Sequence, residues 1–524
     1  MKIFHNARIH TLDRNHPRAS VIAIDHGEIV AVGGEEILGG LHLGDRQDMR
    51  GQAILPGLAD SHLHLKAYAL SLQKIDCETA TLEECLRRVA QRAAQTPPGE
   101  WILGHGWNQN TWGNWPSAAD LDRVAPSHPV FLTAKSLHAA WANSAALKAA
   151  RIDEQSPDPQ EGKIQRDPRG FPTGILLEAA AEPLSRLVPE PSPQALAEAI
   201  EHAQQVLWSY GLTAVHDFDR RDSFVALQTL HAQGRLRLRV TKSIPVDLLE
   251  QAFDLGLGTG FGDEWLRIGS VKVFMDGALG PRTASMFQPY EGEPGNRGIL
   301  NHDAEHLLEL GRRAADAGLG LAVHAIGDRA NHEALEALEH LRRYEAERGL
   351  PRLRHRIEHV QLLHPQDAVR LAQLDVIASM QPLHATSDMH MARRYWGART
   401  TLAYAWKTQL EAGARLAFGS DAPVESPNPF LGVHAAVTRR RADGDPGPGG
   451  WIPDQRLDLQ QAIEGFTTGA AYAANSESRQ GRLAPGYLAD LIVLEEDPFS
   501  LDSHDLRLLR PAATMVGGEW VFQA

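Results

Sequence analysis

The sequence predicts an α/β protein whose centre is a closed (β/α)8 barrel of the TIM type. Eight apolar, strand-like segments follow one another along the chain, and most are separated by stretches with the composition and apolar stripe of helices. Strands that alternate with helices indicate parallel β/α structure, and eight of them favour a barrel. An open, doubly wound sheet is the alternative, but no Gly-x-Gly-x-x-Gly turn follows an early strand to support it.

The predicted strands and helices follow from the spacing of apolar residues. The predicted barrel strands are Ile54–Ala59, Leu212–His216, Leu236–Ser243, Ile268–Met275, Leu319–Ala325, Arg356–Val360, Val376–Gln381 and Arg415–Ser420. Helices are predicted at Gln194–Tyr210, Ala304–Ala317, Asn331–Arg348 and Gln366–Leu374.

Short strands separated by turns occupy both ends of the chain. Because chain termini often lie close together, we expect the two ends to pair into one composite β-sandwich. Between the first two barrel strands the chain is too long for a simple connection, and it holds five of the eleven tryptophans. An insertion at that point leaves a barrel on the face that carries the active site, so it is predicted to form a lid domain. The predicted division is 1–54 (sandwich), 55–70 (first barrel strand), 71–190 (inserted lid), 191–476 (rest of the barrel) and 477–524 (sandwich).

Composition narrows the class of protein. The chain has 524 residues, 43% of them hydrophobic, and a formal net charge of −14, which argues against a nucleic-acid partner. The first residues lack the apolar core of a signal peptide, and no stretch is long and apolar enough to cross a membrane. Two cysteines cannot build a disulfide framework, so a reducing cytoplasm is the expected location.

Metal-capable residues lie in or after five of the predicted strands. His62 and His64 end the first strand, and residues two apart on a strand point to the same face. Later strands carry or end in Lys272, His324, His359 and Asp421. Because active-site groups of a barrel come from the carboxyl ends of several strands, these side chains predict a zinc-like centre that keeps one position open for water.

Lys272 is the unusual member of this set. Burial in an apolar strand lowers the pKa of a lysine, and a neutral amine can react with carbon dioxide to form a carbamate. A carbamate is an anionic oxygen ligand that can bridge two metal ions. The alternative is a buried ion pair of Lys272 with Asp276 or Glu358, and an unmodified lysine would indicate a one-metal site.

Several stretches resemble the amidohydrolase superfamily, in the amidohydrolase-3 branch of YtcJ-like and N-substituted formamide deformylase-like proteins. The resemblance covers nearly the whole chain, with two departures, Ser136-Leu137-His138 where relatives often carry Asp-Gly-His and Gly280-Pro281-Arg282 where they often carry Gly-Ser-Arg. The stretches that carry the resemblance are 55–64, 104–108, 272–284, 324–328, 356–359, 419–424 and 486–494.

The resemblance implies a metal-dependent hydrolase that cleaves a non-peptide C–N bond, in an amide or an N-substituted formamide, with metal-bound hydroxide as the nucleophile. It implies two divalent metal ions, expected to be Zn²⁺, bridged by carboxylated Lys272. One ion would be bound by His62, His64 and Asp421, and the other by His324 and His359. Asp421 would also be the catalytic proton shuttle, which takes a proton from the attacking water and gives one to the leaving amine.

Five further residues are predicted to contact a small-molecule substrate: Trp107, His138, His216, Arg282 and His384. Each has a structural alternative. The first two could belong to the core of the insertion, His216 could orient other groups, Arg282 could pair with a surface acid, and His384 could serve loop structure.

Two other functions stay open. A mononuclear deaminase or a cyclic-amide hydrolase would use the same scaffold, and a regulatory or ligand-binding protein would not catalyse at all. A homodimer is also expected.

Overall fold

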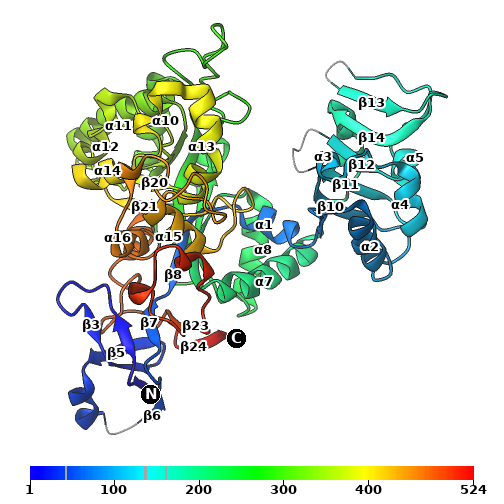
Figure 1. The fold of residues 1–524 in the computed structure, drawn as a ribbon. Coiled ribbons are helices and arrows are strands. Elements are labelled where there is room, and N and C mark those ends of the chain that lie inside the picture. Colours follow the sequence, from blue (N-terminus) through cyan, green and yellow to red (C-terminus); the bar gives the residue numbers. More distant parts are fainter. Residues whose placement is uncertain (42–43, 135–138, 160–161) are drawn as a thin grey trace. The chain divides into compact units, whose positions relative to one another are not determined.

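Eight parallel strands form the central sheet of the computed structural model, which describes residues 1–41, 44–134, 139–159 and 162–524 (Figure 1). They are hydrogen-bonded in chain order and confirm the predicted barrel. The barrel strands are β8 (Leu58–Leu63), β15 (Leu212–Asp217), β16 (Arg239–Pro245), β17 (Leu266–Phe274), β18 (Leu321–Ala325), β19 (Arg356–His359), β20 (Ile377–Met380) and β21 (Leu416–Phe418).

The last strand returns to the first and nearly closes the barrel. The backbone N–H of Asp421 donates to the carbonyl of His62 at 2.7 Å. Beside this bond, Asp60 accepts hydrogen bonds from the backbone N–H of Ser420 at 3.0 Å and from its hydroxyl at 2.5 Å. A side chain on Gly419 would collide with the backbone nitrogen of His62 at 2.5 Å, so the two strand ends approach closely only because this position is glycine.

Helices follow most barrel strands, and their apolar faces pack on the barrel. In α10, for example, Asp303 caps the first turn by accepting from the N–H of His306 at 2.9 Å, and Leu307, Ala314 and Ala315 are buried. The main helices are α7 (Pro193–Ser209), α8 (Arg221–Ala232), α9 (Leu249–Asp254), α10 (Ala304–Asp316), α11 (Asp328–Arg348), α12 (Arg370–Gln373), α13 (Pro382–Trp396), α14 (Trp406–Ala412), α15 (Pro429–Thr438), α16 (Leu459–Gly465) and α17 (Thr468–Ala473).

The two chain ends form one β-sandwich, as expected. Its sheets have the orders β5-β4-β1-β6 and β24-β23-β22-β7-β2-β3, and side chains such as Phe4, Ile24 and Leu491 fill the space between them. The strands are β1 (Lys2–His5), β2 (Arg8–His10), β3 (Arg18–Ala19), β4 (Val21–Asp25), β5 (Glu28–Gly33), β6 (Asp45–Asp48), β7 (Ala53–Pro56), β22 (Leu491–Leu494), β23 (Ala513–Val516) and β24 (Glu519–Gln523).

The predicted first barrel strand, Ile54–Ala59, is wrong in its bounds. Residues 53–56 are β7 of the sandwich, and the barrel strand β8 begins only at Leu58. The apolar run is continuous because both strands are buried, so hydrophobicity cannot mark the transfer between sheets. Gly57 lies between them, where an added Cβ would stand 2.4 Å from the side chain of Thr213.

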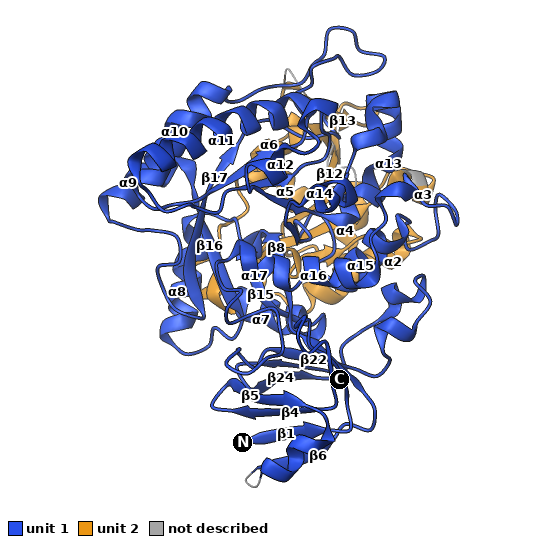
Figure 2. Cartoon of the chain, turned by 90° about the vertical axis from the view of Figure 1, so that its left-hand side faces the viewer, with its two compact units in different colours: residues 1–68, 200–524 blue, residues 69–199 orange. Residues whose placement is uncertain are grey.

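Residues 69–199 form a second compact unit, coloured apart in Figure 2. It spans the whole of the predicted insertion, 71–190, and contains a mixed sheet with the order β13-β14-β12-β11-β10-β9. Its strands are β9 (Ile75–Asp76), β10 (Ile102–Trp107), β11 (Val130–Ala134), β12 (Ala139–Ala142), β13 (Gly162–Arg166) and β14 (Pro172–Glu178), and its helices include α2 (Leu82–Ala93), α4 (Ala118–Val124) and α5 (Ser144–Ala149).

Both cysteines, Cys77 and Cys85, are free and buried in the core of this second unit. Across the described residues, no helix has the length and apolar character of a membrane span.

The barrel is fastened to the sandwich by a buried ion pair. Arg239 of β16 donates to both carboxylate oxygens of Asp490, at 2.6 and 2.9 Å, and the two side chains are 4% and 9% exposed.

Arg239→Met should leave Asp490 buried without its partner and lower the free energy of unfolding by about 3–5 kcal/mol in urea denaturation. Arg313→Met is the matched control, because it breaks an exposed pair with Glu250 and should change stability little. Equal effects of the two substitutions would contradict this role of the buried pair.

Candidate metal centre

Two histidines lie at the end of β8, His62 within the strand and His64 directly after it, and a carboxylate fixes one ring nitrogen of each. The Nδ1–H of His62 donates to Glu358 at 2.6 Å, and that of His64 donates to Asp219 at 3.2 Å. Each ring therefore turns Nε2 to the opposite side, toward Asp421. Histidine ligands of metals are commonly oriented in this way by an oxygen acceptor behind the ring.

The next two histidines follow the same rule on neighbouring strands. His324 of β18 donates its Nε2–H to the carbonyl of Gly277 at 3.0 Å, so Nδ1 is its free nitrogen. His359 ends β19 and donates its Nδ1–H to the side-chain oxygen of Gln381 at 2.8 Å, so Nε2 is free. The ring centroids of the two histidines are 4.6 Å apart.

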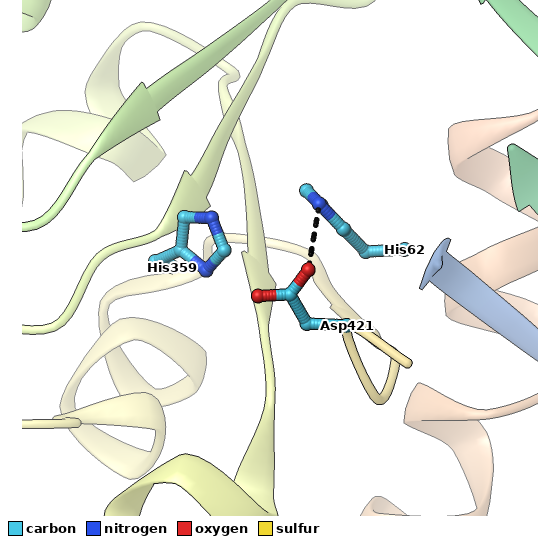
Figure 3. A group of neighbouring side chains, drawn as sticks. All are labelled: His62, His359 and Asp421. Atoms are coloured by element: carbon cyan, nitrogen blue, oxygen red, sulfur yellow. Dashed lines mark ion pairs between the residues drawn. The ribbon is translucent and has the colours of Figure 1, made fainter. Parts of the chain in front are cut away.

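Asp421, which follows the last barrel strand, β21, also belongs to this group. Its Oδ1 lies 3.5 Å from Nε2 of both His62 and His64. Single ligand atoms of His62, His359 and Asp421 lie within 4.8 Å of one another, and Figure 3 shows the three side chains turned toward one space. This is the one such group of histidine, cysteine or acidic residues found among the described residues.

The electrostatics favour neutral imidazoles beside an ionised carboxylate. Burial lowers the pKa of His62 to about 4 and that of His324 to about 3, and it lowers the pKa of His359 well below the usual value. Burial alone would raise the pKa of Asp421, but the hydrogen bond from His64 and the nearby imidazoles hold it well below its usual range.

His64 differs from the other three histidines. Burial alone would lower its pKa, but the carboxylates of Asp219 and Asp421 raise it to about 9. A cation at this position would have to displace the proton, because metals bind the deprotonated ring.

Lys272 lies on β17 with its amine in an apolar environment. The side chain is buried, and Nζ has no hydrogen-bond partner among the described residues. It lies 4.8 Å from the ring centroids of both Phe218 and Phe274. Burial lowers the pKa of the amine to about 8, against the opposing effect of the carboxylates of Glu358 and Asp421. The predicted alternative, an ion pair with Asp276 or Glu358, does not form in the part of the chain described.

Comparisons with known proteins assign the family. Residues 46–522 match the amidohydrolase family. The chain belongs to the amidohydrolase family. It is 33% identical to YtcJ of Bacillus subtilis (strain 168), with 99% of each chain covered. It is 29% identical to N-substituted formamide deformylase of Arthrobacter pascens, over 98% of this chain and 96% of the relative.

A comparison with solved structures supports the same family assignment. A metal-dependent hydrolase from Pyrococcus furiosus, itself uncharacterized, superposes with a TM-score of 0.79 at 30% identity, over 95% of this chain and 100% of the other. The predicted resemblance is thus confirmed, and this amidohydrolase-family chain is a hydrolase.

Arg356, Glu358 and His216 form a buried network that contacts the metal-capable residue His62. Arg356 pairs with Glu358, the carboxylate that holds His62, and donates to Nδ1 of His216 at 2.8 Å. His216 is 2% exposed. Its ring thus accepts from Arg356, which fits the orienting alternative for His216 and leaves a substrate contact as a prediction.

The other predicted substrate contacts are scattered. Trp107 is fully buried in the core of the second unit, where its indole N–H donates to the carbonyl of Leu132, and its role as a substrate contact stays a prediction. Arg282 pairs with Glu293 at 2.5 Å, as its surface-acid alternative anticipated. His384 does lie beside the centre, 3.7 Å from Asp421. His138 lies outside the described residues.

Several residues of the site were not predicted. Phe218 stacks on His62 with centroids 4.1 Å apart, and Gln381 and Asp219 accept hydrogen bonds from the candidate ligands His359 and His64. Only their position in the sequence could have indicated them. Gln381 and Asp219 lie one and two residues after the seventh and second strands, where a barrel places its active-site groups.

Glu358→Gln tests whether this network tunes metal binding. The amide keeps the shape of the carboxylate but weakens the hold on His62, so affinity for a divalent ion should fall about 10- to 100-fold. Competition with a chelator measures this affinity. Glu345→Gln is a matched control, because Glu345 also pairs with a histidine, His355, and an arginine, Arg342, but in a separate cluster. Equal metal affinity in the two variants would contradict the assigned role of Glu358.

Proposed function

We propose that this amidohydrolase-family protein hydrolyses a non-peptide C–N bond, in an amide or an N-substituted formamide, with two divalent metal ions, expected to be zinc. One observation carries the proposal: His62, His359 and Asp421 turn ligand atoms toward one space, and His62, His324 and His359 each have one ring nitrogen bonded to a neighbouring oxygen and the other not. An unpartnered lysine amine lies on the same barrel. The name of the Arthrobacter pascens relative supports the formamide class.

The residues present fit the two ions. His62, His64 and Asp421 would hold one, His324 and His359 the other, and Lys272, once carboxylated, would bridge them. An unpartnered buried amine with a pKa near 8 is the state from which a carbamate forms. When bound, such ions polarise a carbonyl group and lower the pKa of water toward 7.

The protein's own groups supply orientation and proton transfer. The acceptors behind the histidine rings fix which nitrogen faces the substrate space. Asp421 is ionised at neutral pH, because its pKa is held well below the usual range, so Oδ2 can accept a proton from the attacking water. The same oxygen then returns the proton to the leaving nitrogen. The rings of Phe218 and Phe274 both lie 4.8 Å from the amine of Lys272, which is buried.

A substrate panel tests the reaction class. The zinc-loaded protein is assayed with N-substituted formamides, acetamides, cyclic amides, lactones and amino-substituted heterocycles. Release of an amine from an acyclic amide or formamide is expected. Release of ammonia from a ring would instead indicate a deaminase, and no turnover with full metal content would indicate a binding protein. A cytoplasmic homodimer that acts on a small molecule remains the accompanying prediction.

The carbamate on Lys272 has a predictable pH dependence. The pKa of the amine is lowered to about 8, so the reactive neutral amine is fully present above that pH and is lost as the pH falls through 8. With ¹³C-bicarbonate, a carbamate resonance should appear in NMR spectra of metal-free protein and weaken as the pH is lowered. Lys272→Gln should lack it. A resonance that persists in this variant would contradict the assignment.

Asp421→Asn separates metal binding from proton transfer. The amide oxygen can still face the metal, but the side chain can no longer accept and return a proton, so turnover should fall about 10²- to 10⁴-fold. Metal content by elemental analysis should remain close to that of the wild type. Asp454→Asn, on an exposed turn, is the control and should leave turnover unchanged. Normal turnover of Asp421→Asn would remove this residue from the mechanism.

A further inference from the structure

His384 reaches the metal centre from a helix rather than from a strand. It is the third residue of α13, directly after β20, and is 7% exposed. Its ring lies nearly parallel to that of His359, at a centroid distance of 5.9 Å and an interplanar angle of 14°. The side chain therefore borders the space that His359 and Asp421 also face.

One hydrogen bond defines the protonation pattern of this ring. The side-chain N–H of Gln361 donates to Nδ1 of His384 at 3.3 Å. Since an amide N–H can only donate, Nδ1 is the acceptor, and a neutral ring carries its proton on Nε2. The main chain of Gln361 is fixed beside the ring, because the residue is 4% exposed and its backbone carbonyl accepts from the backbone N–H of Tyr404 at 2.8 Å.

The Nε2–H of His384 has no hydrogen-bond partner among the residues described. It lies 3.7 Å from Oδ2 of Asp421, whereas Oδ1 of the same carboxylate faces His62 and His64. The carboxylate thus has one oxygen on the ligand side and one on the His384 side. A buried donor without an acceptor is unfavourable, and it signals a group that a ligand completes.

We propose that His384 is a catalytic residue that donates its Nε2–H to the carbonyl oxygen of the scissile amide as that oxygen becomes negative, and that Gln361 is the positioning residue that fixes its tautomer. This rests on the proposed function. A fixed donor in a buried site stabilises a developing oxyanion without reorganising. The proton stays on His384 throughout, so the transfer to the leaving nitrogen remains with Asp421.

Substitutions at position 384 test the donor. His384→Phe keeps the volume and removes the N–H, and it should lower kcat about 10²- to 10³-fold on the best substrate of the panel, with little change in KM or metal content. His384→Gln places an amide N–H near the position of Nε2 and should recover at least tenfold of that loss. His390→Gln is the control on the same helix, because His390 is exposed and pairs with Asp445. It should behave as the wild type.

A second measurement reads the tautomer without turnover. In ¹⁵N-histidine-labelled protein, the signals of residue 384, assigned by difference from His384→Gln, should show a protonated Nε2 and an unprotonated Nδ1. Gln361→Met keeps the size of the side chain but removes the hydrogen bond. It should give a mixture of tautomers and a lower kcat, with metal content unchanged.

The outcomes separate this inference from the proposed function. If no amide or formamide is hydrolysed by the wild type, the proposed function fails, and the tautomer measurement still tests the role of Gln361. If the wild type is active, wild-type kcat in His384→Phe overturns the donor role, and so does loss of metal in that variant. Equal activity of His384→Gln and His384→Phe also overturns it. A wild-type ring protonated on Nδ1 overturns the role of Gln361.

Discussion

The centre depends on the junction between the first and last strands of the barrel. Asp60, buried and bonded to the backbone of both His62 and Ser420, holds the two strand ends at hydrogen-bonding distance. Burial raises the pKa of this carboxyl group to about 7, and the hydrogen bonds that it accepts from Ser420 and His62 oppose the rise. Without this junction, the histidine pair and Asp421, which are more than 350 residues apart in sequence, would not share one space.

Hydrogen-bond polarity is the second organising constraint. Every histidine that faces the centre has one nitrogen committed to a neighbour, so the free nitrogen is chosen before any ligand arrives. Behind the ligand candidates the neighbour is an oxygen, as Glu358 is for His62. Behind His384 it is an N–H instead, so the nitrogen that faces the centre carries a hydrogen and can donate a hydrogen bond rather than a lone pair. The same residue type thus acquires two different chemistries at one site.

Much of the fold and of the candidate site could be predicted from the sequence, and the predictions that failed did so for physical reasons. His62, His324, His359 and Asp421 are recognisable because each ends an apolar segment, and the barrel rule brings such ends together. The residues that orient these rings follow no local sequence pattern. Gln361, for example, acts only through its hydrogen bond to the ring of His384, which lies on a helix later in the chain. Buried strands in two successive sheets also look alike in sequence, which is why the limits of β7 and β8 were misplaced. The tryptophans of the insertion were ambiguous for a related reason, since packing and ligand binding favour the same residue types.

The passage from β7 to β8 links the sandwich directly to the metal-capable histidines. Only five residues, 57–61, separate the last sandwich residue, Pro56, from His62. Such a short connection transmits displacement, so a shift of β7 along its sheet would carry the histidine pair with it. The sandwich therefore acts as a fixed anchor for the first ligand strand. A change in the register of β7 would therefore move His62 out of line with the other groups of the centre, although β7 itself contributes no residue to it.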